Sequence, residues 1–230
     1  MKKHNSEIEQ NPFSLSIGDL MSALLLVFAL LLSGAMLKLQ KAQVKLVAEQ
    51  ERLENIPKQY ENTCLAIYTE LDSVFADDME KWGAEIDSTT LSIRFLKENI
   101  MFDNNETALK ADFKAILDEF FPRYLAIIRQ YTDHITEIRI EGHTSSTGEY
   151  FHNMELSQDR ARNVLIYCTT TNSLAYKKLI TDKVTANGYS YSRTLKNKQG
   201  EEDETRSRRV EFRIITDSEQ QIQNILQAIQ

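Results

Sequence analysis

The chain has 230 residues, a formal net charge of −7 at pH 7 and a mean hydropathy of −0.40, values typical of a largely soluble protein. Its length accommodates one ordinary domain together with additional segments. Because the chain is acidic and its basic residues gather only in a short run at 206–209, we expect no binding to nucleic acid.

The first feature along the chain is an apolar segment that follows a short polar tail at 1–14. Residues 20–37 contain no charged side chain, and only two serines and one glycine interrupt the apolar sequence. An α-helix rises about 1.5 Å per residue, so roughly 20 such residues cross the hydrocarbon core of a bilayer. The sequence therefore predicts a transmembrane helix over 15–37.

Two properties of this segment allow other interpretations. The small residues at 33–35 resemble a signal-peptidase site, so a cleaved signal peptide is the main alternative. The apolar run, however, begins next to an acid, and the helical pattern continues well past residue 33. Lysines lie on both sides of the segment, and their count by itself weakly favours a cytoplasmic C-terminus.

Beyond the apolar segment, leucines continue to recur every seven residues. A period of seven indicates one stripe of a supercoiling helix, and the stripe consists of Leu25, Leu32, Leu39, Leu46 and Leu53. We therefore predict a helical linker over 38–83, in which a short coiled coil ends near Pro57 and a second helix covers 58–82. A single amphipathic helix that lies on another surface is the alternative.

The remainder of the chain alternates strand-like and helix-like patterns. Alternating apolar residues predict strands at 88–96, 134–144, 183–190 and 208–216, and helical spacing predicts helices at 107–131, 150–170 and 217–230. Pro122 is a position at which the first of these helices can kink. Together the elements predict a compact domain of mixed helix and strand, α+β or α/β, over 84–216, followed by a C-terminal helix.

The residue types that carry out catalysis or hold metals are dispersed. Cys64 and Cys168 match no metal-binding spacing and are too distant in the sequence to indicate a disulfide. His134, His143 and His152 are also scattered, so a zinc site is not expected. The sequence contains neither a glycine-rich phosphate loop nor a pattern typical of a nucleophile with its base. We therefore expect a protein that is not an enzyme and uses no metal or cofactor.

The apolar helix carries one acid, Asp19, at its start. At 100° per residue, Ser22 and Ser33 fall within about 60° of Asp19, so the three form a thin polar seam on an apolar cylinder. An ionised acid at bilayer depth costs about 2.5–3.5 kcal/mol, so it is normally hidden against protein or water. Because burial disfavours the charged form of a carboxyl group, such an acid suits a proton relay. The alternative is that Asp19 is an N-cap or a partner of the helix dipole at headgroup level.

A second group of polar residues lies on the helix predicted at 150–170. Asn153, Leu156 and Arg160 are spaced by three and four residues, so they share one narrow arc of the helix. Just upstream, residues 142–148 form the small-residue loop GHTSSTG, which is rich in hydroxyls and backbone donors. An arginine beside such a loop can clamp a carboxylate with two hydrogen bonds. The alternative is that Arg160 is an ordinary solvated surface residue.

A resemblance to a known family covers this part of the chain. The OmpA-like peptidoglycan-binding domain has the pattern G-H-T-D, a spaced Y-N and L-S-x-x-R-A-x-x-V, and it is similar to the stretch IEGHTSSTGEYFHNMELSQDRARNVLIY. The matching residues are Gly142, His143, Thr144, Asn153, Leu156, Ser157, Arg160, Ala161 and Val164. Further matches at 100–109, 186–190 and 207–214 extend the resemblance over roughly residues 91–215.

The resemblance implies a βαβαβ-type domain that binds the cell wall. It implies that Arg160 holds the carboxylate of the diaminopimelate residue in the wall peptide, in a site that includes Thr144, Ser145, Asn153 and Leu156. The family's aspartate after the threonine, which would hold the diaminopimelate amine, is replaced here by Ser145, and a serine supplies no counter-charge. A histidine also stands at the position of the family's tyrosine.

The order of one acidic membrane helix, a short helical linker and an OmpA-like domain resembles the MotB type of stator subunit. The channel helix of that family is similar to residues 16–32, SIGDLMSALLLVFALLL. Two shorter segments, GDLMSALLLVF and GHTSS, are most similar to the ZorB family, the stator-like subunits of the Zorya anti-phage defence system.

This second resemblance implies a role for the membrane helix and a set of partners. Asp19 is implied to carry the ion, with protons favoured over sodium, and Ser22 and Ser33 are expected to line the channel. The implied assembly is a homodimer surrounded by a ring of multi-span MotA-like, here ZorA-like, subunits, in which ion flow drives rotation. The implied location is the bacterial inner membrane, with the tail at 1–14 in the cytoplasm and the C-terminal domain bound to peptidoglycan in the periplasm.

Three other functions stay open at this point. A flagellar MotB-like stator subunit is one, although members of that family usually carry a longer basic N-terminal tail than the fourteen mixed residues here. A passive OmpA-like wall anchor, which would conduct no ions, is another. A force-transducing subunit of the TolR or ExbD kind would also have one acidic helix. The periplasmic domain of that kind is smaller, however, and lacks the L-S-x-x-R-A pattern that ends at Ala161 here.

Overall fold

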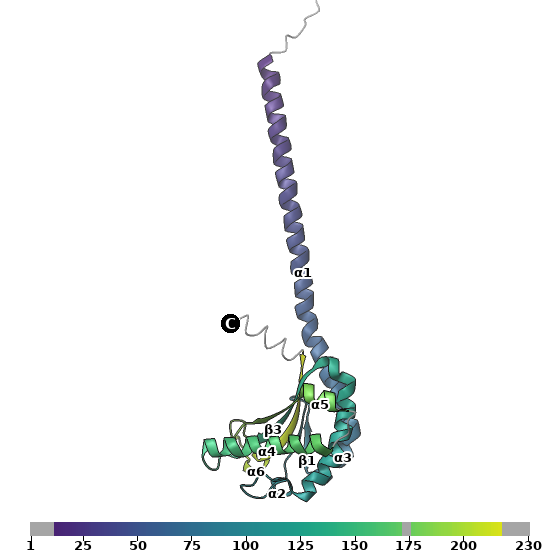
Figure 1. The fold of residues 1–230 in the computed structure, drawn as a ribbon. Helices are drawn as coiled ribbons and strands as arrows, with labels where there is room; N and C mark the ends of the chain where they lie inside the picture. The colour runs from purple at the N-terminus through teal and green to yellow at the C-terminus, as the bar shows by residue number, and fades with distance from the viewer. Residues whose placement is uncertain (1–11, 172–175, 218–230) are drawn as a thin grey trace, which may run out of the picture. The chain divides into compact units, whose positions relative to one another are not determined.

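The computed structural model describes residues 12–171 and 176–217. The chain divides into two compact units, Met1–Asn55 and Ile56–Gln230, and Figure 1 shows their ribbons. Residues 218–230 of the predicted C-terminal helix and residues 1–11 of the predicted tail lie outside the described residues. The prediction that the tail extends to residue 14 is wrong, because the first helix already begins at Pro12.

The first helix, α1 (Pro12–Trp82), supplies residues to both units. Its segment Ile17–Glu51 is long and apolar enough to cross a membrane, and none of its most apolar stretch is buried within the chain. The transmembrane helix predicted over 15–37 is therefore part of one continuous helix, whose large apolar side chains from Ile17 to Leu37 are exposed.

The prediction that one helix ends near Pro57 and a second begins at 58 is wrong, because α1 continues through this position. Proline lacks a backbone N–H, so its presence removes one helical hydrogen bond. The flanking residues, EQERLEN before it and KQYEN after it, are mostly strong helix formers, which favours continuation of the helix. Pro57 instead lies beside the boundary between the two units, at Asn55 and Ile56. The coiled coil stays a prediction.

The second unit contains a five-stranded sheet in the order β1-β2-β5-β3-β4. The strands are β1 (Ala84–Asp87), β2 (Ser92–Phe95), β3 (Ile135–His143), β4 (Val184–Gly188) and β5 (Arg209–Thr216). β3 and β4 are parallel, and the other neighbours are antiparallel. The four predicted strands are confirmed, whereas β1 is additional, and the mixed sheet confirms the α+β class.

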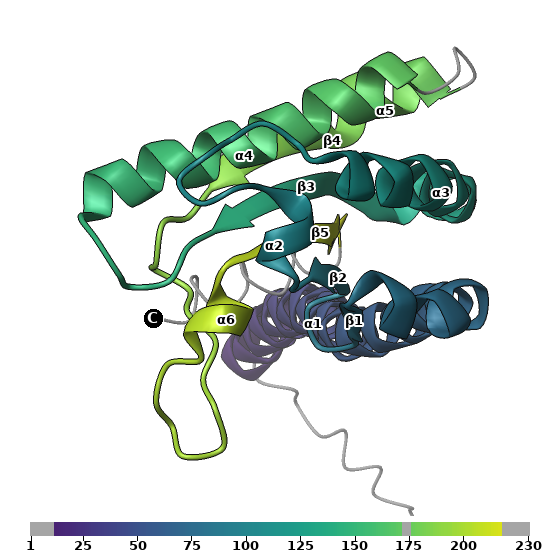
Figure 2. The ribbon, with the colours of Figure 1, turned by 90° about the horizontal axis from the view of Figure 1, so that it is seen from below.

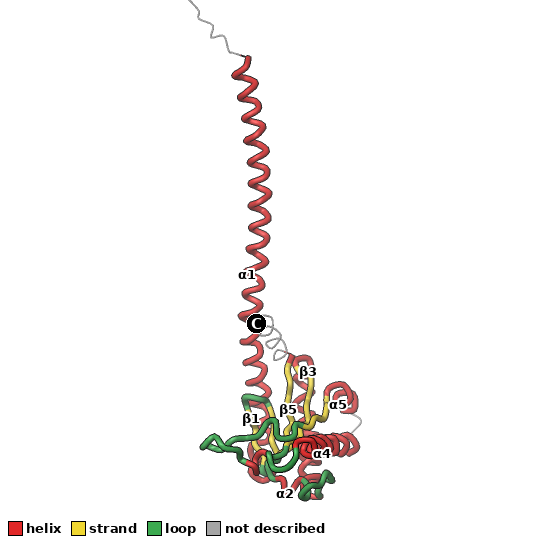
Figure 3. The backbone as a smooth tube through the Cα atoms, turned by 90° about the vertical axis from the view of Figure 1, so that its left-hand side faces the viewer, coloured by secondary structure: helices red, strands yellow, loops and turns green. Residues whose placement is uncertain are grey.

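The longer helices of this unit lie along one side of the sheet, as Figures 2 and 3 show. The helices of the unit differ widely in length. They are α2 (Glu98–Met101), α3 (Ala111–Ile128), α4 (Tyr150–Thr171), α5 (Lys177–Lys183) and α6 (Glu204–Ser207), with a 3-10 turn η1 (Arg129–His134). The helices predicted at 107–131 and 150–170 correspond to α3 and α4. α3 continues through Pro122 and ends at Ile128.

Aromatic side chains form most of the core. Phe120 of α3 has ring neighbours from three other elements: Phe75 of α1 at 5.3 Å, Phe95 of β2 at 5.2 Å and Phe212 of β5 at 4.9 Å between centroids. All four side chains are buried. The last turns of α1 are therefore part of the second unit, and they are held there by apolar burial.

Two glycines allow α4 to lie directly against the sheet. Gly142 of β3 and Gly188 of β4 are partners in the strand register. A Cβ atom at Gly142 would lie 2.1 Å from the backbone oxygen of Ser157, and one at Gly188 would lie 2.4 Å from the backbone nitrogen of Gln158. A hydrogen bond stabilises the contact, since Gly188 N donates to Gln158 Oε1 at 2.7 Å. This close approach determines where α4 presents Arg160, less than one turn further along.

Candidate functional site

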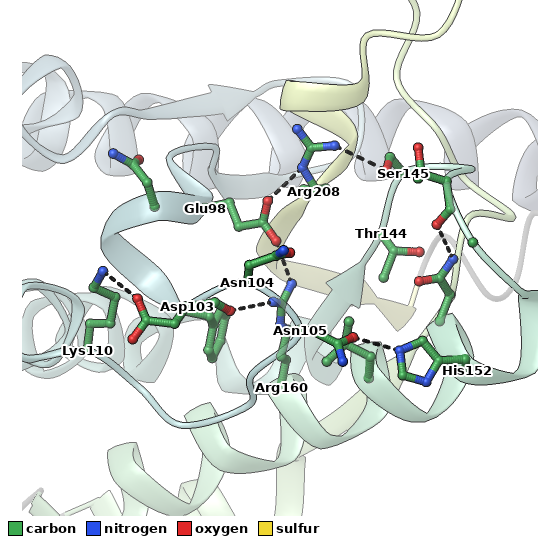
Figure 4. Close-up of a pocket in the computed structure, with 16 residues that line it drawn as sticks. Glu98, Asp103, Asn104, Asn105, Lys110, Thr144, Ser145, His152, Arg160 and Arg208 are labelled. Atoms are coloured by element: carbon green, nitrogen blue, oxygen red, sulfur yellow. Dashed lines mark hydrogen bonds and ion pairs between the residues drawn. The ribbon is translucent and has the colours of Figure 1, made fainter.

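A cavity of about 540 Å³ lies beside the N-terminal half of α4. Figure 4 shows its labelled residues converging from α2 and the loop after it, the β3–α4 loop, α4 and the segment before β5. The five residues predicted for wall binding all line it: Thr144, Ser145, Asn153, Leu156 and Arg160. The fold therefore brings to one cavity five residues that are grouped in the sequence only by the motif they share.

Arg160 is buried at the base of this cavity, with 3% of its surface exposed. Its Nε donates to Glu106 O at 2.9 Å, its Nη1 to Glu98 Oε1 at 2.9 Å and its Nη2 to Asp103 O at 3.3 Å. The guanidinium also lies over the Phe102 ring, 4.7 Å from its centroid. Burial lowers the pKa of Arg160, and the Glu98 carboxylate opposes that shift. The alternative that Arg160 is a solvated surface residue is wrong.

Four charged residues of the cavity lining had not been predicted, Glu98, Asp103, Lys110 and Arg208, and two of them contact predicted residues through their side chains. The Glu98 carboxylate bonds to Arg160 through one oxygen and to Arg208 Nε through the other, at 2.6 Å. Arg208 also donates from Nη1 to Ser145 Oγ at 3.2 Å. In the sequence, Arg208 belongs to a short basic run and to the matched segment 207–214, but neither feature indicates a place in the site, and Glu98 has no distinguishing pattern around it.

The β3–α4 loop is held at both ends and presents hydroxyl groups to the cavity. Thr144 N donates to Ser190 O at 2.9 Å, and Asn153 Nδ2 donates to Thr147 O at 2.9 Å. Within the described residues, the buried Oγ1 of Thr144 has no hydrogen-bond partner. A buried hydroxyl without a partner is costly, so this atom is available to bind a ligand.

The rim of the cavity adds polar side chains from the loop after α2. His152 Nε2 lies 2.7 Å from Asn105 Oδ1, and Lys110 Nζ lies 2.9 Å from Asp103 Oδ1. Together with Arg160 in the base, these groups combine cations, carboxylates and amides around one space. Such a mixture suits a ligand that carries both anionic and cationic groups, such as an amino acid or a peptide.

A separate buried cluster involves His143, which the sequence had not favoured as a metal ligand. Donor atoms of Glu141, His143 and Glu211 lie within 4.8 Å of one another. Each carboxylate already faces an arginine: Arg209 Nε donates to Glu211, and Arg193 Nη1 lies 3.3 Å from Glu141. Burial lowers the pKa of His143, which keeps the imidazole neutral near pH 7. The charges of this cluster are thus balanced without an added cation.

The predicted channel residues belong to the first unit and do not line the cavity. Asp19, Ser22 and Ser33 are exposed on α1, and the helical period places them on one face. Ser22 Oγ donates to Gly18 O at 2.8 Å, so its hydrogen-bonding need is met within the helix. Because α1 begins at Pro12, Asp19 lies beyond its first turn, and the N-cap alternative is wrong.

Known proteins resemble this chain over most of its length. The sequence profile of the OmpA family matches residues 101–208. A Zorya protein ZorB from Escherichia coli strain Crooks is 41% identical over 228 residues, which span 95% of this chain and 94% of that protein. A ZorB from a second Escherichia coli strain is 25% identical over 227 residues, covering 93% and 84% respectively.

Solved structures give a more distant likeness. A MotB-like protein from Desulfovibrio vulgaris has a TM-score of 0.49 and 20% sequence identity, and the match covers 69% of this chain and 98% of that one.

Proposed function

This chain belongs to the ZorB family, and from that premise we propose that it is the wall-anchored membrane subunit of a proton-driven stator complex in Zorya anti-phage defence. The 41% identity over nearly the whole of both chains is the observation that carries the proposal. The chain would cross the inner membrane once, with its N-terminus in the cytoplasm and its second unit in the periplasm.

The membrane half of the proposal rests on Asp19. This acid lies in the helical segment that is long and apolar enough to cross a membrane. A charge inside the hydrocarbon core of a bilayer is costly unless protein or water surrounds it. Acids within membrane helices therefore usually mark ion pathways. We propose that Asp19 takes up a proton from one side and releases it to the other, and that Ser22 and Ser33 line the pathway.

The partners follow from the same helix. One apolar helix cannot enclose a water-filled pathway by itself, so Asp19 needs neighbouring helices to shield it. We propose that these come from a second copy of this chain and from a surrounding ring of multi-span, ZorA-like subunits. Proton flow past Asp19 would then drive motion of the ring relative to the anchored dimer.

The wall-binding half rests on the cavity beside α4. Thr144, Ser145, Asn153, Leu156 and Arg160 line it together, and its cations and amides suit a peptide with free carboxylates. We propose that this cavity binds the peptide of peptidoglycan and so holds the complex stationary.

Replacing Asp19 by Asn tests the proton-carrying role, because the change removes the ionisable group and little else. The variant is expected to insert and assemble normally but to lose protection against phage and proton conductance. Plating efficiency of phage and pH change inside ZorA-containing proteoliposomes measure the two losses. Glu49→Gln is the matched control, since this exposed acid of the same helix lies outside the apolar run.

Two results would redirect the proposal. An Asp19→Asn variant with full protection would show that the helix is only an anchor, provided that Arg160→Ala removes activity. Restoration of swimming in a flagellar stator mutant, without phage protection, would assign the chain to motility instead.

A further inference from the structure

Glu98 is the one carboxylate in the described cavity lining whose two oxygens each contact an arginine. Oε1 lies 2.9 Å from Arg160 Nη1, and Oε2 lies 2.6 Å from Arg208 Nε. Figure 4 shows the Glu98 side chain between the two guanidinium groups. A carboxylate held by two guanidinium groups has the geometry of a bound anionic ligand.

The two arginines differ in their access to solvent. The Arg160 side chain is 4% exposed, whereas Glu98 is 23% and Arg208 is 30% exposed. A ligand that enters the cavity therefore meets Arg208 and Glu98 before it meets Arg160. Arg160 cannot accept an external carboxylate on Nη1 while Glu98 occupies that position.

Arg160 is the residue that the family resemblance already implies as a carboxylate ligand. We propose that Arg208 completes this carboxylate subsite, and that Glu98 is an internal occupant which the ligand displaces. The inference rests on the proposed wall binding and specifies its chemistry. A ligand therefore binds tightly only if its carboxylate bonds to both arginines more strongly than the Glu98 carboxylate does.

Both arginines retain other contacts when Glu98 leaves. Arg160 still donates to the backbone oxygens of Glu106 and Asp103, and Arg208 still bonds to Ser145 and Glu204. The subsite therefore keeps its shape for an incoming carboxylate, and a preformed site binds with less loss of entropy.

Glu98 can move away without disturbing the core. It is the first residue of the four-residue helix α2, and it is partly exposed at the cavity. The buried residue of α2 is Met101, which anchors the short helix independently of Glu98. We therefore expect rotation of the Glu98 side chain to open the subsite while Met101 holds α2 in place.

The experiment measures binding of a defined probe to the full-length chain in detergent. The probe is the tripeptide L-alanyl-γ-D-glutamyl-meso-diaminopimelate, and calorimetry gives its dissociation constant. Glu98→Gln is expected to tighten binding by about fivefold or more, because the internal competitor loses its charge. Arg208→Gln is expected to weaken binding by at least about tenfold, and amidating the tripeptide carboxylates is expected to weaken wild-type binding similarly.

Matched controls come from an ion pair outside the cavity. Glu85 pairs with Arg206 at 2.7 Å, and neither residue lines the cavity. Glu85→Gln and Arg206→Gln are therefore expected to leave the dissociation constant unchanged. Thermal unfolding without ligand identifies a misfolded variant, and Arg208→Gln still tests the subsite if Glu98→Gln fails to fold.

The outcomes separate the two proposals. If the wild-type chain binds the tripeptide and cosediments with purified peptidoglycan, but folded Glu98→Gln binds equally or more weakly, the internal-occupant role is wrong. Unchanged binding by Arg208→Gln would overturn the carboxylate subsite. If the wild-type chain binds neither tripeptide nor peptidoglycan, the proposed wall binding is wrong, and this inference is wrong with it.

Discussion

At the scale of single residues, Gly142 shows how one small side chain determines the position of the site. It lies at the contact between β3 and α4, where an added Cβ would be 2.1 Å from a backbone oxygen. A side chain can relieve such a clash by changing its rotamer, but a backbone atom cannot, so the helix or the strand would have to shift. Any such shift would also move Arg160, which is three residues beyond the contacted Ser157.

Gly142→Ala is therefore expected to destabilise the second unit by about 3 kcal/mol. Urea unfolding followed by fluorescence of Trp82 measures this, because Trp82 is the single tryptophan and is buried. Gly200→Ala is the control: Gly200 has a φ of 85° but no atom within 4 Å of the added Cβ, so only backbone strain of about 1 kcal/mol is expected. Equal losses in the two variants would contradict the packing argument.

The residues of the cavity were predictable only where they share a motif. Asn153 and Arg160 lie on one helix, so their spacing in the sequence already places them on one face. Glu98 reaches Arg160 across 62 residues, and Arg208 comes from the segment before the last strand. Contacts between such distant segments depend on the strand order, which periodicity does not reveal. The placement of Asp19, Ser22 and Ser33 on one helical face was predictable because a continuous helix preserves its angular spacing, whereas their role in a channel stays a proposal.

At the scale of elements, the last part of α1 is attached to the second unit by buried apolar residues. Phe75 is fully buried, with the Phe120 ring at 5.3 Å and the Arg123 guanidinium 4.8 Å from its ring centroid. Arg123 also bonds to Asp78 of α1 at 2.7 Å, which joins α3 to the same helix. The end of α1 is therefore an integral part of the domain fold.

Phe75→Ala is expected to lower the free energy of unfolding of the second unit by about 3–5 kcal/mol, since it removes a buried ring and leaves a cavity. Chemical denaturation monitored by circular dichroism provides the measurement. Leu65→Ala is the matched control on the same helix, because Leu65 is 61% exposed and should cost little. If both variants unfold like the wild type, the packing of α1 on α3 contributes little to stability.

The elements that the sequence missed are short or depend on their partners. β1 and α2 have four residues each, too few for a periodic pattern to emerge. β1 is stabilised by its antiparallel pairing with β2, which a reading of local patterns does not include. The wrong prediction of a helix end at Pro57 has the opposite cause. Proline is a strong local signal for a helix end, but good helix formers on both sides outweigh it.

At the scale of the whole molecule, the chain joins an exposed apolar helix to a folded domain with a charged cavity. The first unit carries Asp19 on the apolar part of its helix, and the second unit contains a cavity lined by charged residues. In the proposed function neither half suffices, because an unanchored channel would turn with its ring and an anchor without a proton carrier would produce no force. Function should therefore be lost by a change in either unit.

The number of Asp19 carboxylates in the assembly gives the last prediction. If two copies of the chain form one proton pathway and both acids are needed, a single Asp19→Asn copy inactivates its dimer. Equal co-expression of variant and wild-type chains should then leave about one quarter of the activity, since random pairing yields that share of wild-type dimers. A functional monomer would retain about half. Proton conductance per protein distinguishes the two values, and differently tagged copies that fail to co-purify would contradict the dimer.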